Sequence, residues 1–234
     1  MHYRYIKKRP ASKKYFLPRF VFPRYLPLIF VIAGGLFILN VIFPILSYQF
    51  FISPQLTALL SPEAKKNVLA ETTSTLDYTQ ASNWFPSAPK LPPLSTKITY
   101  YTLSIPKLKI TDASVQIGGD DLKKSLIHWQ GTAFPGQLGN AVIFGHSSLP
   151  QFFNPKNYLT IFATLPNLKN GDEILVKFDG ILYKYVVEEM VEVTPDDISI
   201  LEQNYNNSYL TLVTCVPPGT VFRRLVVKAK ISKI

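Results

Sequence analysis

The feature that most constrains this chain is a stretch without any charged residue, which runs from Tyr25 to Pro62. Its most apolar part, about Leu26 to Ser47, matches the roughly 20 helical residues that cross a bilayer core. A cleavable signal peptide is the competing interpretation. Its apolar region would be shorter, roughly 7 to 15 residues, and would end at a small-residue cleavage site, which 47–51 does not supply. The sequence therefore predicts an uncleaved transmembrane anchor over 25–48.

The basic residues are concentrated before this stretch. The chain has a formal charge of +10, and its first 24 residues hold eight Lys and Arg and no acidic residue. Without those eight, 17 basic residues stand against 15 acidic ones. A nucleic-acid-binding protein would carry its positive charge on the folded domain, so that class is disfavoured. Because Lys and Arg mark the cytoplasmic side of a membrane, we predict a cytoplasmic tail over 1–24 and an extracellular chain from Gln49 onward.

Two regions follow the anchor. Residues 49–97 are predicted to form an extracellular stalk, because four prolines lie between Pro86 and Pro93 and proline-dense sequence favours extended spacing. Trp84 and Phe85 interrupt this region and are interpreted as a local hydrophobic contact, with a short lid as the alternative. Residues 98–234 are predicted to be the folded domain.

The folded domain has an all-β pattern. The dipeptide Asp179-Gly180 favours a type I′ hairpin turn. Single helical turns are expected near 120–126, 157–165 and 195–203. Many short strands between turn signals indicate a barrel or a sandwich. The strands, rich in β-branched and aromatic residues, are predicted at 98–105, 113–117, 140–146, 172–178, 181–192, 208–215 and 222–231.

Cys215 is the only cysteine, so an exported domain has no intramolecular disulfide to form. A free cysteine is most often a small buried hydrophobe. Cys215, however, ends a strand-like run directly before a Pro/Gly-rich loop, and functional side chains gather on such rims. Both interpretations stay open on the residue type alone.

A histidine and two arginines also lie near strand ends. His146 closes the run from 140, whereas His128, beside an aromatic residue, is the weaker candidate. By the period of two, Arg224 and Arg223 face opposite sides of the last strand, and Arg223 shares the more apolar side. A thiolate needs a base or a cationic neighbour, and a guanidinium can stabilise an oxyanion. With one Cys and two extracellular His, no zinc site is expected, and no phosphate-binding loop is present.

Several stretches between about 100 and 230 together resemble the sortase family of cysteine transpeptidases. The order His, Cys, Arg is also that of the family. The stretches are Thr211-Leu212-Val213-Thr214-Cys215, similar to the Thr-Leu-x-Thr-Cys signature; Gly139 to His146, similar to the histidine strand; Gly131 to Gly136, similar to the turn before it; Ile105 to Leu108, similar to the opening strand; and Arg224 to Val227, similar to the arginine strand.

The resemblance implies a closed, roughly eight-stranded β-barrel with a substrate groove on its outer wall. It implies Cys215 as nucleophile, His146 as general acid and base, and Arg224 as the group that steadies the thiolate and the oxyanion. The substrate contacts that it implies are Thr214, Val213 and Ser147.

The implied reaction cuts a motif similar to Leu-Pro-x-Thr-Gly in secreted proteins through a thioester. The acyl group then passes to an amine, either of a peptidoglycan precursor or of a pilin lysine. No cofactor is implied, and activation by calcium stays open.

Other assignments remain alternatives. No Asp-Pro-Trp or Asp-Pro-Phe lid of the pilus-type branch is present, and prolines soon after Cys215 resemble class D, class E or housekeeping enzymes. A non-catalytic surface scaffold of the same fold, which binds sorting peptides, is the runner-up. An L,D-transpeptidase is disfavoured because Thr214, and not a His-Gly pair, precedes the cysteine.

Overall fold

The computed structural model describes residues 25–58, 77–89, 92 and 96–233. The chain divides into two compact units, 1–39 and 40–234, and the second contains all the strands. The predicted cytoplasmic tail over 1–24 lies outside the described residues.

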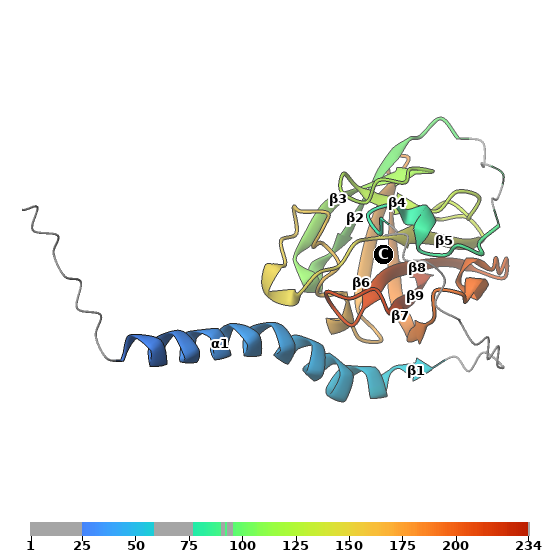
Figure 1. Ribbon diagram of the computed structural model, residues 1–234. Coiled ribbons are helices and arrows are strands. Elements are labelled where there is room, and N and C mark those ends of the chain that lie inside the picture. The colour runs from blue at the N-terminus through green and yellow to red at the C-terminus, as the bar shows by residue number, and fades with distance from the viewer. Residues whose placement is uncertain (1–24, 59–76, 90–91, 93–95, 234) are drawn as a thin grey trace, which may run out of the picture. The chain divides into compact units, whose positions relative to one another are not determined.

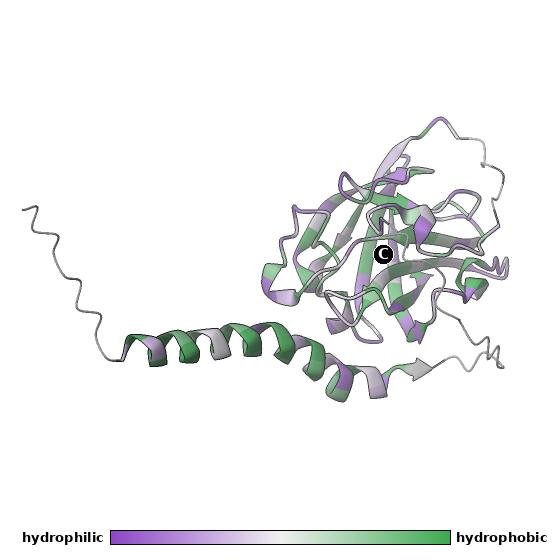
Figure 2. Ribbon diagram, in the orientation of Figure 1, coloured by the Kyte–Doolittle hydropathy of each residue, from purple (hydrophilic) through white to green (hydrophobic). Residues whose placement is uncertain are grey.

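The predicted anchor is helical. Helix α1 (Leu26–Ser47) carries no charge, and at about 1.5 Å per residue its 22 residues match a bilayer core of about 30 Å. It has no buried residue and is apolar along most of its length (Figure 2). By length and composition it is the one membrane-span candidate among the described residues. A π-helical turn (Tyr48–Ile52) and a 3₁₀ turn (Ser53–Gln55) follow it.

Eight strands close into a barrel, which confirms the predicted all-β fold (Figure 1). Strands β7 and β9 pair with each other and complete the circle β7-β6-β2-β3-β4-β5-β8-β9. A ninth, two-residue strand, β1 (Thr57–Ala58), adds to β7 in parallel. The barrel strands are β2 (Tyr100–Ile105), β3 (Ile110–Ile117), β4 (Leu126–His128), β5 (Gly139–Phe144), β6 (Glu173–Phe178), β7 (Ile181–Val193), β8 (Ser208–Val216) and β9 (Arg223–Ser232).

Alternation along the strands produces two apolar layers. On β8, Leu210 and Leu212 point into the barrel core, whereas Val213 and Cys215 belong to a second cluster on the outer face. On β9, Leu225 likewise joins the core. Because successive side chains face opposite sides of a strand, both layers are continuous across β5, β8, β9 and β7.

The clearest predicted turn is present. Strands β6 and β7 pair from Phe178 and Ile181 onward around Asp179 and Gly180, whose φ angles are 52° and 75°. Positive φ at both central residues is what a type I′ turn requires.

One expected helical turn is wrong, another is displaced, and one strand of the barrel, besides the short β1, was missed. The segment near 120–126 forms turns without a helix. In the segment near 157–165 a 3₁₀ helix begins only at its last residue (Leu165–Asn167), whereas the turn near 195–203 exists as a 3₁₀ helix (Ile198–Leu201). Strand β4 has only three residues, all buried, so it shows no alternation in the sequence. It forms because β3 and β5 pair with it on its two sides.

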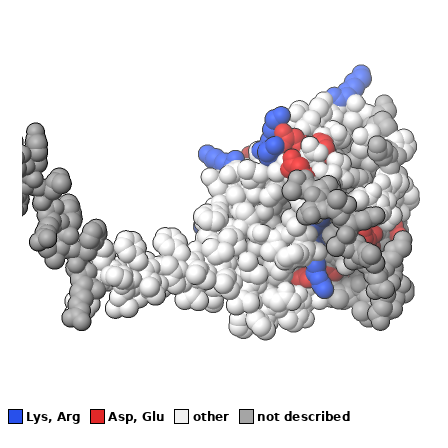
Figure 3. Space-filling model, in the orientation of Figure 1, with Lys and Arg blue, Asp and Glu red and all other residues white. Residues whose placement is uncertain are grey.

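The charges of the barrel are mixed in sign on the face seen in Figure 3, and α1 is uncharged there. Several pair across neighbouring strands, such as Lys184 with Glu173 and Lys230 with Glu188. This distribution agrees with the near balance of charges outside the first 24 residues.

Candidate active site

Three of the residues singled out in the sequence meet at one end of the barrel wall. Strands β5 and β8 run parallel with Phe144 opposite Val213, so His146, two residues beyond the end of β5, and Cys215, two residues further along β8, lie at the same level. On the other side of β8, Cys215 is the register partner of Arg224 on β9. The pairing of β5, β8 and β9 therefore juxtaposes an imidazole, a thiol and a guanidinium.

The two adjacent arginines occupy different environments, as the strand alternation predicts. Arg224 is fully buried on the outer face that carries Cys215 and Val226. Arg223 keeps 56% of its side chain exposed and lies 3.4 Å from the carboxylate of Glu192. Arg224 is therefore the arginine whose charge acts on the thiol.

The guanidinium of Arg224 is held by backbone carbonyls. Its Nη1 donates to Val221 O at 2.9 Å, and its Nη2 donates to Trp84 O at 3.2 Å. Its buried Nε has no acceptor within the described part of the chain. An unpaired buried donor of a charged group is costly, so Nε is suited to bind a carbonyl or an oxyanion that arrives with a substrate.

Side-chain hydroxyls tie the histidine segment to the cysteine strand. Thr214 Oγ1 donates to Gly145 O at 2.8 Å, and Ser147 Oγ donates to Cys215 O at 2.7 Å. Both residues are buried. Val213, the third expected substrate contact, is buried in the outer apolar cluster next to Cys215. In the described arrangement these three residues hold the site together.

The orientation of His146 is set by a backbone contact. Its Nδ1 lies 2.9 Å from Leu159 O, and since a carbonyl can only accept, Nδ1 carries the proton and donates. Nε2 is thereby the nitrogen that can take up and release a proton. Gly145 allows the chain to reach this position, because a Cβ there would overlap the ring of Phe162.

Both titratable groups of the site are neutral near pH 7 in this arrangement. Burial raises the pKa of the Cys215 thiol to about 11, although the charge of Arg224 acts in the opposite direction. Burial also lowers the pKa of His146, against the effect of its hydrogen bonds. Exposing Cys215 to solvent would remove the effect of burial on its pKa, which is the larger of the two effects, and would keep the effect of the Arg224 charge. Exposure therefore favours the thiolate.

What buries the site is a segment that precedes the barrel. We call residues 77–89 the cover segment. Trp84 and Phe85 are almost fully buried and pack on Phe144 of β5, with ring centroids 5.7 and 5.8 Å apart. The Arg224 guanidinium lies 5.3 Å from the Trp84 ring centroid. Cys215, in the same cluster, is left 5% exposed.

Polar contacts attach the cover segment to the loop between β3 and β4. Ser82 donates to the Asp120 carboxylate from its backbone N, at 2.7 Å, and from its hydroxyl, at 3.0 Å. Ala81 N donates to Asp120 O at 2.9 Å. The sequence alone predicts this segment as part of the stalk. The signal for its packing was the pair of large aromatic residues among the prolines, but the partners of the segment, from Asp120 to Arg224, lie 38 to 140 residues away in the chain.

His128 does not take part in the site. It is buried in the core, where Nδ1 lies 2.8 Å from Tyr101 Oη and Nε2 lies 3.1 Å from Thr132 Oγ1. Burial lowers its pKa to about 4, so it stays neutral. Among the residues that the structure describes, no group of three or more His, Cys, Asp or Glu is arranged to hold a metal ion.

Comparison with known proteins agrees with this geometry. The sortase domain family matches residues 103–232, more than half of the chain. A sortase A of Streptococcus agalactiae is 30% identical over 73 residues, which are 31% of this chain and 29% of the relative. A sortase D of Bacillus subtilis is 28% identical over 118 residues, 49% of this chain and 53% of the relative. The chain thus spans about half or less of the curated relatives' length.

A solved structure shows the same barrel. The sortase D5 transpeptidase of Clostridium perfringens superposes with a TM-score of 0.50 at 26% identity, over 60% of this chain and 82% of that one. Fold, domain match and the placement of His146, Cys215 and Arg224 point the same way. The chain belongs to the sortase family.

Proposed function

We propose that this protein is a membrane-anchored cysteine transpeptidase that cuts a sorting motif similar to Leu-Pro-x-Thr-Gly and joins the new carboxyl end to an amine. The observation that carries the proposal is the meeting of Cys215, His146 and Arg224 at the ends of β8, β5 and β9 on the outer wall. A nucleophile, a base and a fixed cation are the parts that acyl transfer through a thioester needs.

In the proposed first half-reaction, His146 Nε2 takes the proton of the Cys215 thiol, and the resulting thiolate attacks the carbonyl carbon of the motif's threonine. The carbonyl oxygen becomes an oxyanion, and Arg224 Nε, which lacks an acceptor, stabilises it. The threonine–glycine C–N bond then breaks as His146 Nε2 gives its proton to the departing amine. The product is a thioester between Cys215 Sγ and the threonine carbonyl.

In the second half-reaction, an incoming amine attacks the thioester. His146 accepts a proton from that amine, an amide bond forms, and Cys215 leaves as a thiolate. The acceptor is proposed to be a peptidoglycan precursor or a pilin lysine, and the substrates are proposed to be secreted proteins with a C-terminal sorting motif. Val213, Thr214 and Ser147 are proposed to contact the peptide or to keep its groove in shape.

The apolar helix α1 supports anchoring in the cell membrane. The eight basic residues before it support an N-terminus in the cytoplasm and a catalytic barrel outside the cell.

The direct test uses the full chain in detergent with a fluorogenic Leu-Pro-Glu-Thr-Gly peptide and triglycine as acceptor. We expect turnover and, by mass spectrometry, a peptide thioester on Cys215. Cys215→Ala and His146→Ala should each abolish turnover, and because the two residues act as one unit, their losses should not add. Arg223→Ala is the folded control. Substantial turnover by either of the first two variants contradicts the assignment.

The burial of Cys215 beneath the cover segment favours a second candidate, a non-catalytic scaffold of the same fold that binds sorting peptides. The two candidates differ in covalent chemistry. A scaffold would bind the fluorescent peptide without forming a thioester, and its affinity would be the same in Cys215→Ala.

A further inference from the structure

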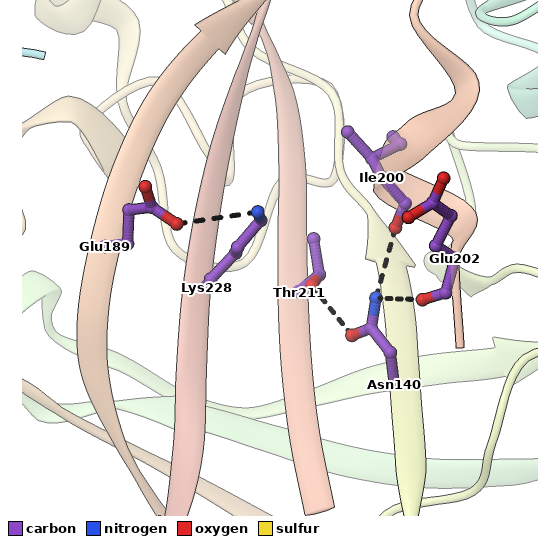
Figure 4. A network of polar contacts seen from close by, with 6 residues as sticks. All are labelled: Asn140, Glu189, Ile200, Glu202, Thr211 and Lys228. Atoms are coloured by element: carbon purple, nitrogen blue, oxygen red, sulfur yellow. Dashed lines mark hydrogen bonds and ion pairs between the residues drawn. The ribbon is translucent and has the colours of Figure 1, made fainter. Parts of the chain in front are cut away.

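A polar pocket lies on the same outer barrel face as Cys215, further along the strands. It has a volume of about 310 Å³. Figure 4 shows part of its lining on β7, β9, β8 and β5, four neighbours in the barrel wall. The residues that matter for the argument are Asn140, Glu188, Glu189, Glu202, Thr211 and Lys228.

The strand register connects this pocket to the catalytic end of the wall. Cys215 pairs with Arg224, Val213 pairs with Val226, and Thr211 pairs with Lys228. Each pair lies two residues further along the same face of β8 and β9. A catalytic level, an apolar level and a polar level therefore follow one another along the outer face of the wall, and the apolar level, Val213 and Val226, is buried beneath the outer cluster that includes the cover segment.

The polar level is built from ordered contacts. Thr211 Oγ1 donates to Asn140 Oδ1 at 2.7 Å, and Asn140 Nδ2 donates to Ile200 O at 3.1 Å. Lys228 Nζ lies 3.5 Å from the Glu189 carboxylate. Thr211 and Asn140 are buried, so the floor of the pocket is held in place by bonds within the wall.

Acidic groups outnumber basic ones around the pocket. Glu188, Glu189 and Glu202 contribute three carboxylates to its lining, and Lys228 contributes the ammonium. Lys228 lies 3.5 Å from Glu189, and Lys230, outside the lining, lies 3.9 Å from Glu188, so Glu202 is the carboxylate without an ion pair among the described residues. None of the described residues of the cover segment is part of the lining. The pocket is thus open while the cover segment buries Cys215, and its charge favours a cation.

The distance from Cys215 to the pocket along the wall indicates which substrate residue can reach the pocket. Thr211 is four residues from Cys215 on β8, which is about 13 Å at about 3.3 Å per residue. An extended peptide covers the same distance in four residues. With the acylated threonine at Cys215, the cover segment detached and the peptide extended along β8 toward Thr211, which is a premise of the inference, the fourth residue before the threonine reaches the pocket. It is the residue that immediately precedes the leucine of Leu-Pro-x-Thr.

We propose that this pocket selects a basic side chain, lysine or arginine, immediately before the sorting motif. The inference rests on the proposed function and adds to it a specificity determinant outside the motif. Glu202, which has no ion pair among the described residues, supplies the attraction, and the floor formed by Asn140 and Thr211 limits how deep the side chain enters.

The test compares three peptides that differ only before the motif: lysine, alanine or glutamate followed by Leu-Pro-Glu-Thr-Gly. With the full chain in detergent, we expect kcat/KM to fall in the order lysine, alanine, glutamate, with roughly a threefold to tenfold range, as expected for partly exposed ion pairs. Raising the ionic strength should compress this range. In Glu202→Gln the ratio of lysine to glutamate peptide should move toward one.

Glu173→Gln is the matched control, because Glu173 is an exposed glutamate of β6 that pairs with Lys184 outside the pocket. It should keep the ratio of the parent chain. Equal kcat/KM for the three peptides, or a ratio unchanged in Glu202→Gln, would overturn the inference and leave the proposed function intact.

Failure of the proposed function gives a different result, namely no cleavage of any peptide and no thioester. In that case, fluorescence anisotropy with the same three peptides, labelled, still reports on the pocket in the Cys215→Ala chain. A preference for the lysine peptide in binding supports the inference, and equal or absent binding overturns it.

Discussion

At the scale of single residues, the two neighbouring arginines of β9 are the sharpest comparison in this protein. They have the same chemistry and adjacent positions, yet one is fully buried beside Cys215 and the other is more than half exposed beside Glu192. The alternation of the strand puts the two side chains on opposite faces, and the cover segment, through Trp84, buries the one on the outer face.

We predict that Arg224→Ala lowers kcat by about 10² to 10³, the usual effect of losing one oxyanion donor. Arg224→Lys should also be strongly impaired, because lysine keeps the charge but lacks the Nε donor and the planar fork. Arg223→Ala should retain most activity. The measurement is kcat/KM on one peptide, with folding checked by circular dichroism. An inactive Arg223→Ala beside an active Arg224→Ala would contradict the role given to Arg224.

His128 makes a prediction about stability. Its pKa is near 6.5 in an unfolded chain and about 4 in the core. Between these values the unfolded state binds more protons, so the free energy of unfolding should decrease as the pH falls from about 6.5 toward 4. The full effect is on the order of 3 kcal/mol. Urea unfolding across this range should show it.

The matched comparison for His128 is His128→Gln, which keeps hydrogen-bonding groups but cannot titrate. Its stability should depend less on pH over the same range. An equal pH dependence in parent and variant would show that other groups carry the effect.

At the scale of elements, the cover segment decides how accessible the thiol is. It is held by aromatic contacts on Phe144 and Arg224 and by the polar contacts of Ser82 with Asp120. Because these contacts involve one short segment outside the paired strands of the barrel, we expect the segment to detach without unfolding the barrel.

We predict that Trp84→Ala speeds alkylation of Cys215 by iodoacetamide and lowers the apparent pKa of the thiol below the value of about 11 that burial imposes. The physical reason is that solvation removes the desolvation cost and leaves the influence of Arg224. The rate of alkylation against pH measures both quantities.

Trp129→Ala is the control for that experiment. Trp129 also packs on Phe144, with ring centroids 5.1 Å apart, but it does not belong to the cover segment. Removing the Trp129 ring should reduce the packing on Phe144 without an equal increase in the rate of Cys215 alkylation. If both variants speed alkylation equally, loosening of the outer cluster, and not removal of the cover, explains the effect.

At the scale of the whole molecule, the chain combines an apolar helix with an eight-stranded barrel. The charge asymmetry before α1 predicts one orientation. Protease added to intact cells should digest or release the chain after about Gln49. A protected barrel would contradict the orientation, and a mature N-terminus near residue 50 would show that the helix is a cleaved signal.

Much of the architecture follows from the sequence by itself. The charge-free run is long enough to predict a membrane-spanning helix. The turn at Asp179-Gly180 needs no distant contact to form. The alternation of β9 likewise separates Arg224 from Arg223 before any partner strand is known. These features are local, so they can be read from neighbouring residues.

The tertiary structure determines which residues, distant in the chain, lie side by side. Strand β4 exists only because β3 and β5 flank it, and His146 meets Cys215 only because β5 and β8 pair in one register. The cover segment and the polar pocket depend on contacts between residues far apart in the chain. Such contacts are set by how the whole barrel closes, and no local pattern of residue types encodes that geometry.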